Sequence, residues 1–323
     1  MKLLVYIPCH TDFAGAVIQA RKFRAESHLY QVSSSSKTVE VEIIISVNSY
    51  EPSEAEKNLA EQVCDEVIYN GIGYLADINI ANGFLLALKK KPELLWLFSA
   101  NDSLNEGALA KVLDEFFLDN SVDLLVTNAL GINSTYKEVE IINPPKSGFC
   151  YGLITGVIYR LKNTHPYFHN GPFLAWTGWS HLAVIQSAMH SLNGLKVKTL
   201  PWADIYEEGA RDLETIYKYG HSIYGMLLLG YAFSRSKRES RKFIRRYVIN
   251  RFYSWHMYTR NWKYTNQLVA NENYLGWNQG MAEALIWKSS KLLFGFYWLM
   301  KKLPLSKIRK FQKNAMVRFF RMT

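Results

Sequence analysis

The feature that most constrains the fold is an alternation of strand-like and helix-like segments over about the first 130 residues. Apolar runs without a helical period predict strands over 2–8, 39–48, 66–69, 94–100 and 122–127. Segments with apolar residues at helical spacing predict helices over 12–29, 53–63, 76–90 and 106–118. This order of elements predicts an α/β fold with a mostly parallel, doubly wound sheet that is flanked by helices.

The fourth strand-like run, Leu94–Leu104, ends in polar residues. Asn101, Asp102 and Ser103 follow an apolar stretch that is typical of a buried strand. Open α/β sheets bind ligands at the carboxyl ends of their strands, so an amide and a carboxylate at this place suit a cation or a phosphate. The same residues also suit the cap of the next helix, and both interpretations remain open.

The pattern loosens after residue 128. Strands are predicted over 138–142, 149–160 and 196–200, a helix over 179–192, and loops around 31–38, 144–145 and 165–172. From residue 213 onward the patterns are helical, with interruptions near residue 234 and over 274–280. We therefore predict an α/β domain over residues 1–210 and a helical C-terminal extension over residues 211–323. Ser53 and Glu56 predict a capping box at the second helix.

Composition limits the setting of the protein. Three widely spaced cysteines, Cys9, Cys64 and Cys150, indicate neither a disulfide framework nor a zinc site and suit a reducing cytosol. We expect no secretory signal, because the apolar run at the N-terminus is short. We expect no transmembrane helix either, since no run of about 18 apolar residues occurs.

The net charge of +10 is concentrated in the C-terminal part. From Tyr231 onward there are 20 lysines and arginines and three acidic residues, so the rest of the chain is net acidic. Residues 284–303 combine a basic stripe of Lys288, Lys291 and Lys302 with a wide apolar face, and a second amphipathic pattern follows Pro304. Such segments bind at an anionic membrane surface, where each basic residue contributes about 1 kcal/mol. A helix packed on the first domain is the competing interpretation, and we expect no nucleic-acid partner because no recognised motif is present.

Three of these features together resemble inverting GT-A glycosyltransferases of the family 2 type from bacterial O-antigen and capsule assembly. They are Ile7-Pro8 at the end of the first strand, the strand Glu42–Asn48, and Trp96–Leu104 at the place of the family's DxD-type element. The likeness covers roughly residues 1–205. A weaker likeness joins Gly178–Leu182 to transferases that add dideoxyhexoses such as abequose.

The resemblance implies a nucleotide-sugar co-substrate and a divalent cation, Mg²⁺ or Mn²⁺. Asp102 matches the metal ligand, and Asn101 stands where many members have another Asp, so weak metal binding is expected. Asn48 stands near the place of an Asp that recognises the nucleotide. Pro8 and Asp77 fall at further nucleotide contacts, although Asp77 and Asn79 also suit the first turn of a helix.

Inversion requires a general base, and the resemblance locates it at the start of the late helix, where this chain has no carboxylate. His181 is the candidate by position, because its ordinary pKa near 6.5 suits proton transfer at neutral pH. A structural histidine is the competing interpretation. Asp204, Glu207 and Glu208 are the alternative bases, and Trp176 and Trp179 are candidates for stacking on a sugar or for the core.

The sequence therefore predicts a glycosyltransferase that uses a nucleotide-sugar donor and a lipid-linked oligosaccharide acceptor in surface polysaccharide biosynthesis. It is expected to transfer a hexosyl or deoxyhexosyl group with inversion. The expected location is cytoplasmic, peripheral on the inner face of the membrane. The alternative is a non-catalytic nucleotide- or glycan-binding protein on a degenerate GT-A fold, since Val47, Asn101 and Ser180 stand where the family has acidic residues.

Overall fold

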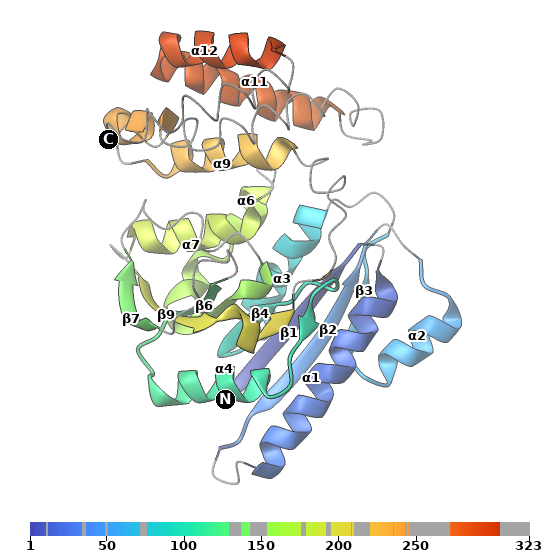
Figure 1. Ribbon diagram of the computed structural model, residues 1–323. Helices are drawn as coiled ribbons and strands as arrows, with labels where there is room; N and C mark the ends of the chain where they lie inside the picture. The colour runs from blue at the N-terminus through green and yellow to red at the C-terminus, as the bar shows by residue number, and fades with distance from the viewer. Residues whose placement is uncertain are drawn as a thin grey trace. The chain divides into compact units, whose positions relative to one another are not determined.

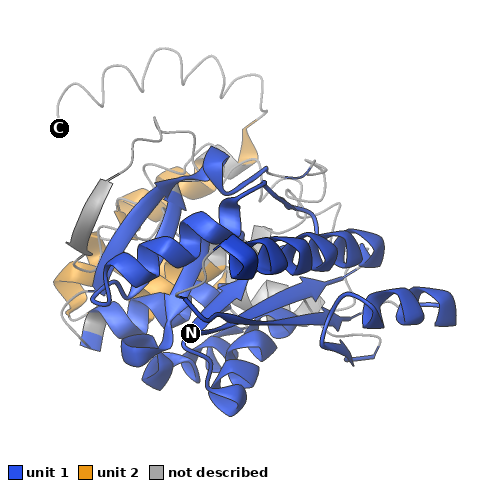
Figure 2. Ribbon diagram, turned by 90° about the horizontal axis from the view of Figure 1, so that it is seen from below, with its two compact units in different colours: residues 1–210 blue, residues 211–323 orange. Residues whose placement is uncertain are grey.

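The chain forms two compact units, Met1–Ala210 and Arg211–Thr323 (Figure 2). The structure is a computed structural model. It describes residues 1–10, 12–33, 37–48, 51–71, 76–128, 137–142, 154–175, 179–191, 195–207, 209, 220–234, 236–242, 244–245 and 272–303.

A mixed sheet forms the centre of the first unit (Figure 1). Within the described residues it has eight strands in the order β3-β2-β1-β4-β8-β6-β9-β7. In chain order they are β1 (Lys2–Cys9), β2 (Glu40–Val47), β3 (Glu66–Tyr69), β4 (Leu94–Leu97), β6 (Leu124–Asn128), β7 (Lys137–Ile142), β8 (Val157–Arg160) and β9 (Leu195–Pro201). Strands β3, β2, β1 and β4 are parallel. β8 is antiparallel to both β4 and β6, β9 is parallel to β6, and β7 is antiparallel to β9.

Helices cover both faces of this sheet, which is why its central strands are almost continuously apolar. The main ones are α1 (Phe13–Ser33), α2 (Glu54–Glu61), α3 (Ala76–Lys90), α4 (Ala108–Leu118) and α7 (Ser180–Ser191). Leu3, Val5 and Ile7 of β1 share one core with α1 and α4. On the other face, a Cβ at Gly83 of α3 would meet Tyr6 and Leu97, so α3 packs closely on β1 and β4.

Aromatic side chains anchor β4 in the first of these cores. Trp96 and Phe98 are fully buried, and both meet Phe23 of α1 edge to face, with ring centroids 5.2 and 5.0 Å away. Such contacts add to the stabilisation from burial and fix the position of a strand. The residues that follow β4 therefore leave a rigid part of the core.

Several predicted elements are confirmed closely. β3 and α3 have the predicted bounds, and the capping box at α2 is present. The Ser53 amide donates to Glu56 Oε2 at 2.8 Å, and the Glu56 amide donates to Ser53 Oγ at 3.4 Å. Local rules of helix capping are sufficient to predict such a feature, because both partners lie within one turn.

Other predicted bounds were wrong. Ile154–Gly156 is a 3₁₀ turn and only Val157–Arg160 is a strand, while residues 149–153 lie outside the described part. The predicted loop 165–172 contains the 3₁₀ helix η2 (His165–Tyr167) and most of α6 (Asn170–Phe173). Prolines indicated a loop there, but proline also fits the first turn of a helix. α1 runs on to Ser33, into the predicted loop 31–38.

The second unit contains α9 (Gly220–Ala232), α11 (Glu272–Ser289) and α12 (Lys291–Lys302) (Figure 1). α11 packs against both α9 and α12. The predicted interruption over 274–280 is wrong, because α11 continues through it. The amphipathic pattern over 284–303 is divided between two helices, because α11 and α12 separate at Ser290, whose Oγ accepts from the Leu293 amide at 3.3 Å. The pattern after Pro304 lies outside the described residues.

Across the described part of the chain, no helix is long and apolar enough to cross a membrane.

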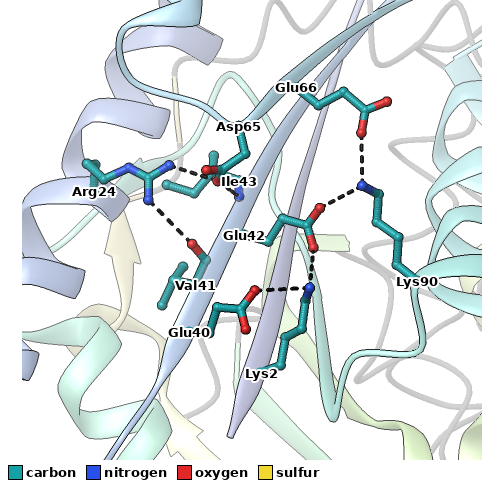
Figure 3. Close-up of polar contacts among 9 residues, drawn as sticks. All are labelled: Lys2, Arg24, Glu40, Val41, Glu42, Ile43, Asp65, Glu66 and Lys90. Carbon is teal, nitrogen blue, oxygen red and sulfur yellow. Dashed lines mark hydrogen bonds and ion pairs between the residues drawn. The ribbon is translucent and has the colours of Figure 1, made fainter.

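A cluster of ion pairs lies at the amino-terminal ends of β1 and β2 (Figure 3). Glu42 accepts from Lys90 at 2.6 Å and lies 2.9 Å from Lys2. Lys90 also meets Glu66 at 2.9 Å, and Lys2 meets Glu40 at 3.1 Å. The cluster therefore joins three parallel strands to the end of α3.

Candidate functional site

The carboxyl ends of four parallel strands lie at one edge of the sheet. The Asn48 amide after β2 donates to Cys9 O at 3.0 Å, and the Asn70 amide after β3 donates to Val47 O at 2.9 Å. On the other side, the Phe98 amide after β4 donates to Tyr6 O of β1 at 2.9 Å. The residues at the ends of β1, β2 and β4 that are predicted to contact the nucleotide and the cation therefore lie at one edge of the sheet, as the parallel pairing requires.

Asp102 is almost completely buried at this edge, with 1% of its surface exposed. Its Oδ2 accepts from the Thr155 hydroxyl at 2.6 Å, and its Oδ1 accepts from the Gly209 amide at 3.2 Å. A buried carboxylate is stable only when hydrogen bonds or charges compensate for lost water. Thr155 and Gly209 supply such compensation from two segments that are remote in sequence.

Thr155 connects Asp102 to the turn that carries it. Its Oγ1 accepts from the Ser99 amide at 2.9 Å, and its carbonyl accepts from Trp96 Nε1 at 2.8 Å. The residue is fully buried. The sequence analysis missed Thr155, because it lay inside a predicted strand and no local pattern distinguishes a threonine with this role.

Two short strands bring the Gly209 segment to Asp102. β5 (Ser103–Leu104) pairs antiparallel with β10 (Tyr206–Glu207), which places Glu207 opposite Ser103. A Cβ at Gly209 would lie only 1.6 Å from the Asn101 carbonyl oxygen, so this approach requires glycine. Strand pairing thus places Glu207, one of the candidate bases, beside the Asn101–Ser103 segment.

Asn101 differs from Asp102 in exposure. Its side chain is exposed, and its amide donates to Ser99 Oγ at 3.3 Å within the turn after β4. The start of α1 lies against the same turn, since a Cβ at Gly15 would be 2.8 Å from Ala100 O. Asp12, which the sequence analysis did not select, caps α1 by accepting from the Gly15 amide at 2.9 Å.

A buried amide fixes the ends of β1 and β2. Asn79 Nδ2 donates to Ser46 O at 2.8 Å, to Asn48 Oδ1 at 3.0 Å and to Cys9 O at 3.2 Å. Asn79 Oδ1 accepts from the Tyr6 and Ser46 hydroxyls at 2.9 and 2.6 Å. Asn79 is therefore a structural centre of the edge, and it orients Asn48, whose exposed fraction is only 1%.

Burial controls the acidity of the neighbouring side chains. It raises the pKa of the Tyr6 phenol above its ordinary value and the pKa of the Cys9 thiol to about 12. Tyr6 is consequently a neutral donor to Asn79, and Cys9 is no nucleophile at neutral pH.

The remaining predicted residues are placed as follows. Pro8 lies within β1, opposite Ser46 of β2. Asp77 lies in the first turn of α3, and its side chain is outside the described part. Trp176 and Glu208 also lie outside the described residues.

The two principal base candidates have different surroundings. His181 is in the first turn of α7 with 4% of its surface exposed, and its ring lies 5.7 Å from that of Trp179. Asp204 ends the 3₁₀ helix η4 (Trp202–Asp204), is half exposed, and meets Lys111 at 3.4 Å. Asp204 is therefore accessible from solvent, whereas His181 is enclosed by the fold.

Asp102 fits a divalent cation only as one of several ligands. The described residues contain no group of three or more His, Cys, Asp and Glu side chains that could hold a metal ion. Mg²⁺ is commonly bound through one or two carboxylates together with the phosphates of a substrate. Asp102 therefore suits a cation whose coordination a diphosphate completes.

No protein-family model matches this sequence, and no curated protein matches it. Solved structures do resemble the fold. S. aureus TarS 1-349 in complex with UDP-GlcNAc is 14% identical over 93% of this chain and 88% of that chain, with a TM-score of 0.52. A longer structure of S. aureus TarS is 12% identical over 91% of this chain, with a TM-score of 0.48, and this chain spans 55% of its length.

A mannosyltransferase, PcManGT from Pyrobaculum calidifontis in complex with GDP-Man and Mn²⁺, is 9% identical over 98% of this chain and 82% of that chain, with a TM-score of 0.46. The TarS 1-349 structure shares its fold with this chain at low sequence identity. The predicted α/β fold of the GT-A type, with a mostly parallel sheet flanked by helices, is confirmed.

Proposed function

We propose that this protein is a glycosyltransferase that moves a sugar from a nucleotide-sugar donor to an acceptor hydroxyl. The observation that supports this most is the placement of Asp102, a buried carboxylate fixed at the carboxyl edge of a GT-A sheet. UDP-GlcNAc is bound by the TarS 1-349 structure that resembles this chain. A nucleotide diphosphate-sugar is accordingly the proposed donor class.

Asp102 is proposed to hold the donor diphosphate through a divalent cation, Mg²⁺ or Mn²⁺. When bound, the cation neutralises the charge that develops on the departing diphosphate. Asn101 supplies an amide and no charge next to Asp102, so the proposed affinity for metal in the absence of nucleotide is low. Asn48 and Pro8, at the ends of β2 and β1, are proposed to contact the nucleotide.

Inversion of the sugar is proposed, with His181 or Asp204 as the base that removes the acceptor proton. The proposed acceptor is a lipid-linked oligosaccharide, and the proposed pathway is surface polysaccharide assembly of the O-antigen or capsule type. The proposed transferred group is a hexosyl or deoxyhexosyl group, as in abequosyl transfer. These details rest on the sequence resemblance described above.

Binding to the inner face of the cytoplasmic membrane is proposed for the helical unit. On α12, Leu292 is 88% exposed, and Phe296 and Leu299 lie on the same exposed stripe. Lys291 and Lys302 lie beside this stripe, and Lys302 Nζ is 3.3 Å from the centroid of the Trp298 ring. A stripe of exposed apolar residues bordered by lysines is better suited to contact with an anionic membrane surface than to contact with water.

The experiment that tests the transferase proposal measures nucleotide release from UDP-GlcNAc and GDP-mannose with Mn²⁺. Asp102→Asn keeps the size of the side chain and removes its charge, and we expect release to fall by about 100-fold or more. Asp119→Asn, at the far end of α4, is the matched control and should keep the wild-type rate. Equal rates for Asp102→Asn and wild type would refute the role of Asp102.

A second outcome identifies the alternative function. Saturable binding of a nucleotide sugar by the wild-type protein, without any release, would indicate a non-catalytic binding protein. Val47, Asn101 and Ser180, which stand where the resemblance leads us to expect acidic residues, favour this alternative.

A further inference from the structure

Two groups from remote parts of the chain hold the carboxylate of Asp102. The Thr155 hydroxyl lies 53 residues away in sequence and donates to Oδ2. The Gly209 amide lies 107 residues away and donates to Oδ1. Both oxygens of one side chain are therefore oriented by partners that the turn after β4 does not itself supply.

The direction of the Thr155 hydrogen bond follows from its second partner. The Ser99 amide can only donate, so Thr155 Oγ1 accepts from it at 2.9 Å and directs its own proton to Asp102. The distance of 2.6 Å to Oδ2 is typical of a hydroxyl bonded to a carboxylate. Because Thr155 is fully buried, water cannot replace this donor.

The main chain of Thr155 is also fixed. Its carbonyl accepts from the indole of Trp96 at 2.8 Å, and Trp96 is itself buried against Phe23 and Phe98. On the other side of the carboxylate, Gly209 approaches Asn101 so closely that no side chain fits. The carboxylate is thus held between the Thr155 hydroxyl, which is fixed in the core, and the backbone amide of Gly209, which lies close to the Asn101 carbonyl.

We propose that Thr155 is a positioning residue that orients the Asp102 carboxylate toward the cation of a metal–nucleotide diphosphate complex. The proposal rests on the proposed function, since it assigns a partner to the same site. Residues that orient a metal ligand in this way typically change metal affinity by about 10- to 100-fold when they are replaced. Thr155 therefore acts through Asp102 and does not itself contact the substrate.

Calorimetric titration of the full chain with UDP and with GDP tests the proposal, each in Mn²⁺ and in EDTA. The quantity of interest is the increase in nucleotide affinity that Mn²⁺ causes. Thr155→Val keeps the shape of the side chain and removes the donor, and we expect this increase to fall by about tenfold or more. Affinity in EDTA should be unchanged, and Thr155→Ser should restore most of the increase.

Thermal unfolding of each variant separates positioning from a general structural role. If Thr155→Val does not fold, Gly209→Ala provides the second test, because it disturbs the other hydrogen bond to Asp102 and should also reduce the Mn²⁺-dependent increase. If Thr155→Val folds and keeps the full Mn²⁺-dependent increase in nucleotide affinity, the proposal is overturned. If Thr155→Val does not fold, a Gly209→Ala protein that keeps the full increase overturns it instead.

The same experiment distinguishes failure of this inference from failure of the proposed function. An Mn²⁺-dependent increase that Asp102→Asn abolishes and Thr155→Val retains refutes only the role of Thr155. Turnover of a nucleotide sugar without any Mn²⁺-dependent increase overturns the inference and leaves the transferase proposal in place. Absence of both binding and turnover rejects the two together.

Discussion

At the scale of single residues, three described side chains are candidates for the base of the proposed reaction. His181 is buried in the first turn of α7, Asp204 is half exposed beside Lys111, and Glu207 lies opposite Ser103 on β10. A general base must approach the acceptor hydroxyl to hydrogen-bond distance. The three candidates differ in access, so substitution can separate them.

We predict that His181→Gln lowers kcat by about 100-fold or more and leaves the KM for the donor nearly unchanged, because a base acts on the acceptor in the transition state. Steady-state kinetics over a range of pH, with a folding check by circular dichroism, measure this effect. Asp204→Asn and Glu207→Gln are the matched variants. Wild-type kcat in His181→Gln, together with a large loss in either carboxylate variant, would assign the base to that carboxylate.

The sequence predicts the Asn101–Asp102 part of this site, but it does not predict the residues that contact Asp102. Asn101 and Asp102 are identified by a change from apolar to polar residues within one segment. Thr155 and Gly209 are not, because strand pairing and loop closure over more than 50 residues decide which groups meet Asp102. Asn79 was interpreted as a residue of a helix start, and its buried network depends on three strand ends.

At the scale of elements, the first half of the sheet follows from local patterns. Parallel strands buried on both faces give uninterrupted apolar runs, and the helices between them have clear caps and periods. β7 lies within one residue of its predicted bounds, but β8 and the pair β5–β10 do not follow in this way. They are short and antiparallel, and their pairing partners lie far away in sequence. The separation of α11 from α12 depends on one serine.

The exposed stripe of α12 provides a prediction at this scale. Replacing Leu292, Phe296 and Leu299 by Gln should lower binding to vesicles that contain phosphatidylglycerol by about tenfold or more, because each replacement removes apolar surface available to the lipid. Sedimentation with the vesicles measures the bound fraction. Replacing Lys291 and Lys302 by Gln should weaken binding further and reduce its dependence on salt.

A matched control uses exposed apolar residues of α1. Ile18, Leu29 and Val32 are 51%, 60% and 72% exposed, and their replacement by Gln removes a similar number of apolar groups. These replacements should leave vesicle binding unchanged. If the α12 variant binds vesicles as the wild type does, the proposed membrane surface is wrong.

At the scale of the whole molecule, the ion pairs around Glu42 connect β1, β2, β3 and α3 (Figure 3). Burial acts to raise the pKa of Glu42, but hydrogen bonds from Lys90 and Lys2 outweigh it and hold the pKa below its ordinary value. Folding therefore favours the ionised carboxylate. Its contribution to stability is present above the pKa of the unfolded chain and is lost as the pH falls through the pKa of the folded state.

We predict that Glu42→Gln lowers the free energy of unfolding by about 1–2 kcal/mol at pH 7, because two partly buried lysines lose their shared partner. The difference from wild type should be constant above about pH 5 and should shrink as the pH falls below about 4. Urea denaturation at several pH values measures it.

Glu40→Gln is the control, since Glu40 shares Lys2 but its side chain is 67% exposed, and its loss should cost less than about 0.5 kcal/mol. A difference between Glu42→Gln and wild type that stays the same down to pH 3 would contradict the assignment.

The hydrogen bond between Gly209 and Asp102 also sets the order in which the protein becomes competent during its synthesis. Chains emerge from the ribosome amino terminus first, at about 5–20 residues per second. The strands β1–β4 and Asp102 are thus complete about 5–20 seconds before the residue that closes over the carboxylate has been made. A nascent chain therefore contains four of the eight described strands of the sheet well before it contains the backbone amide that donates to Asp102.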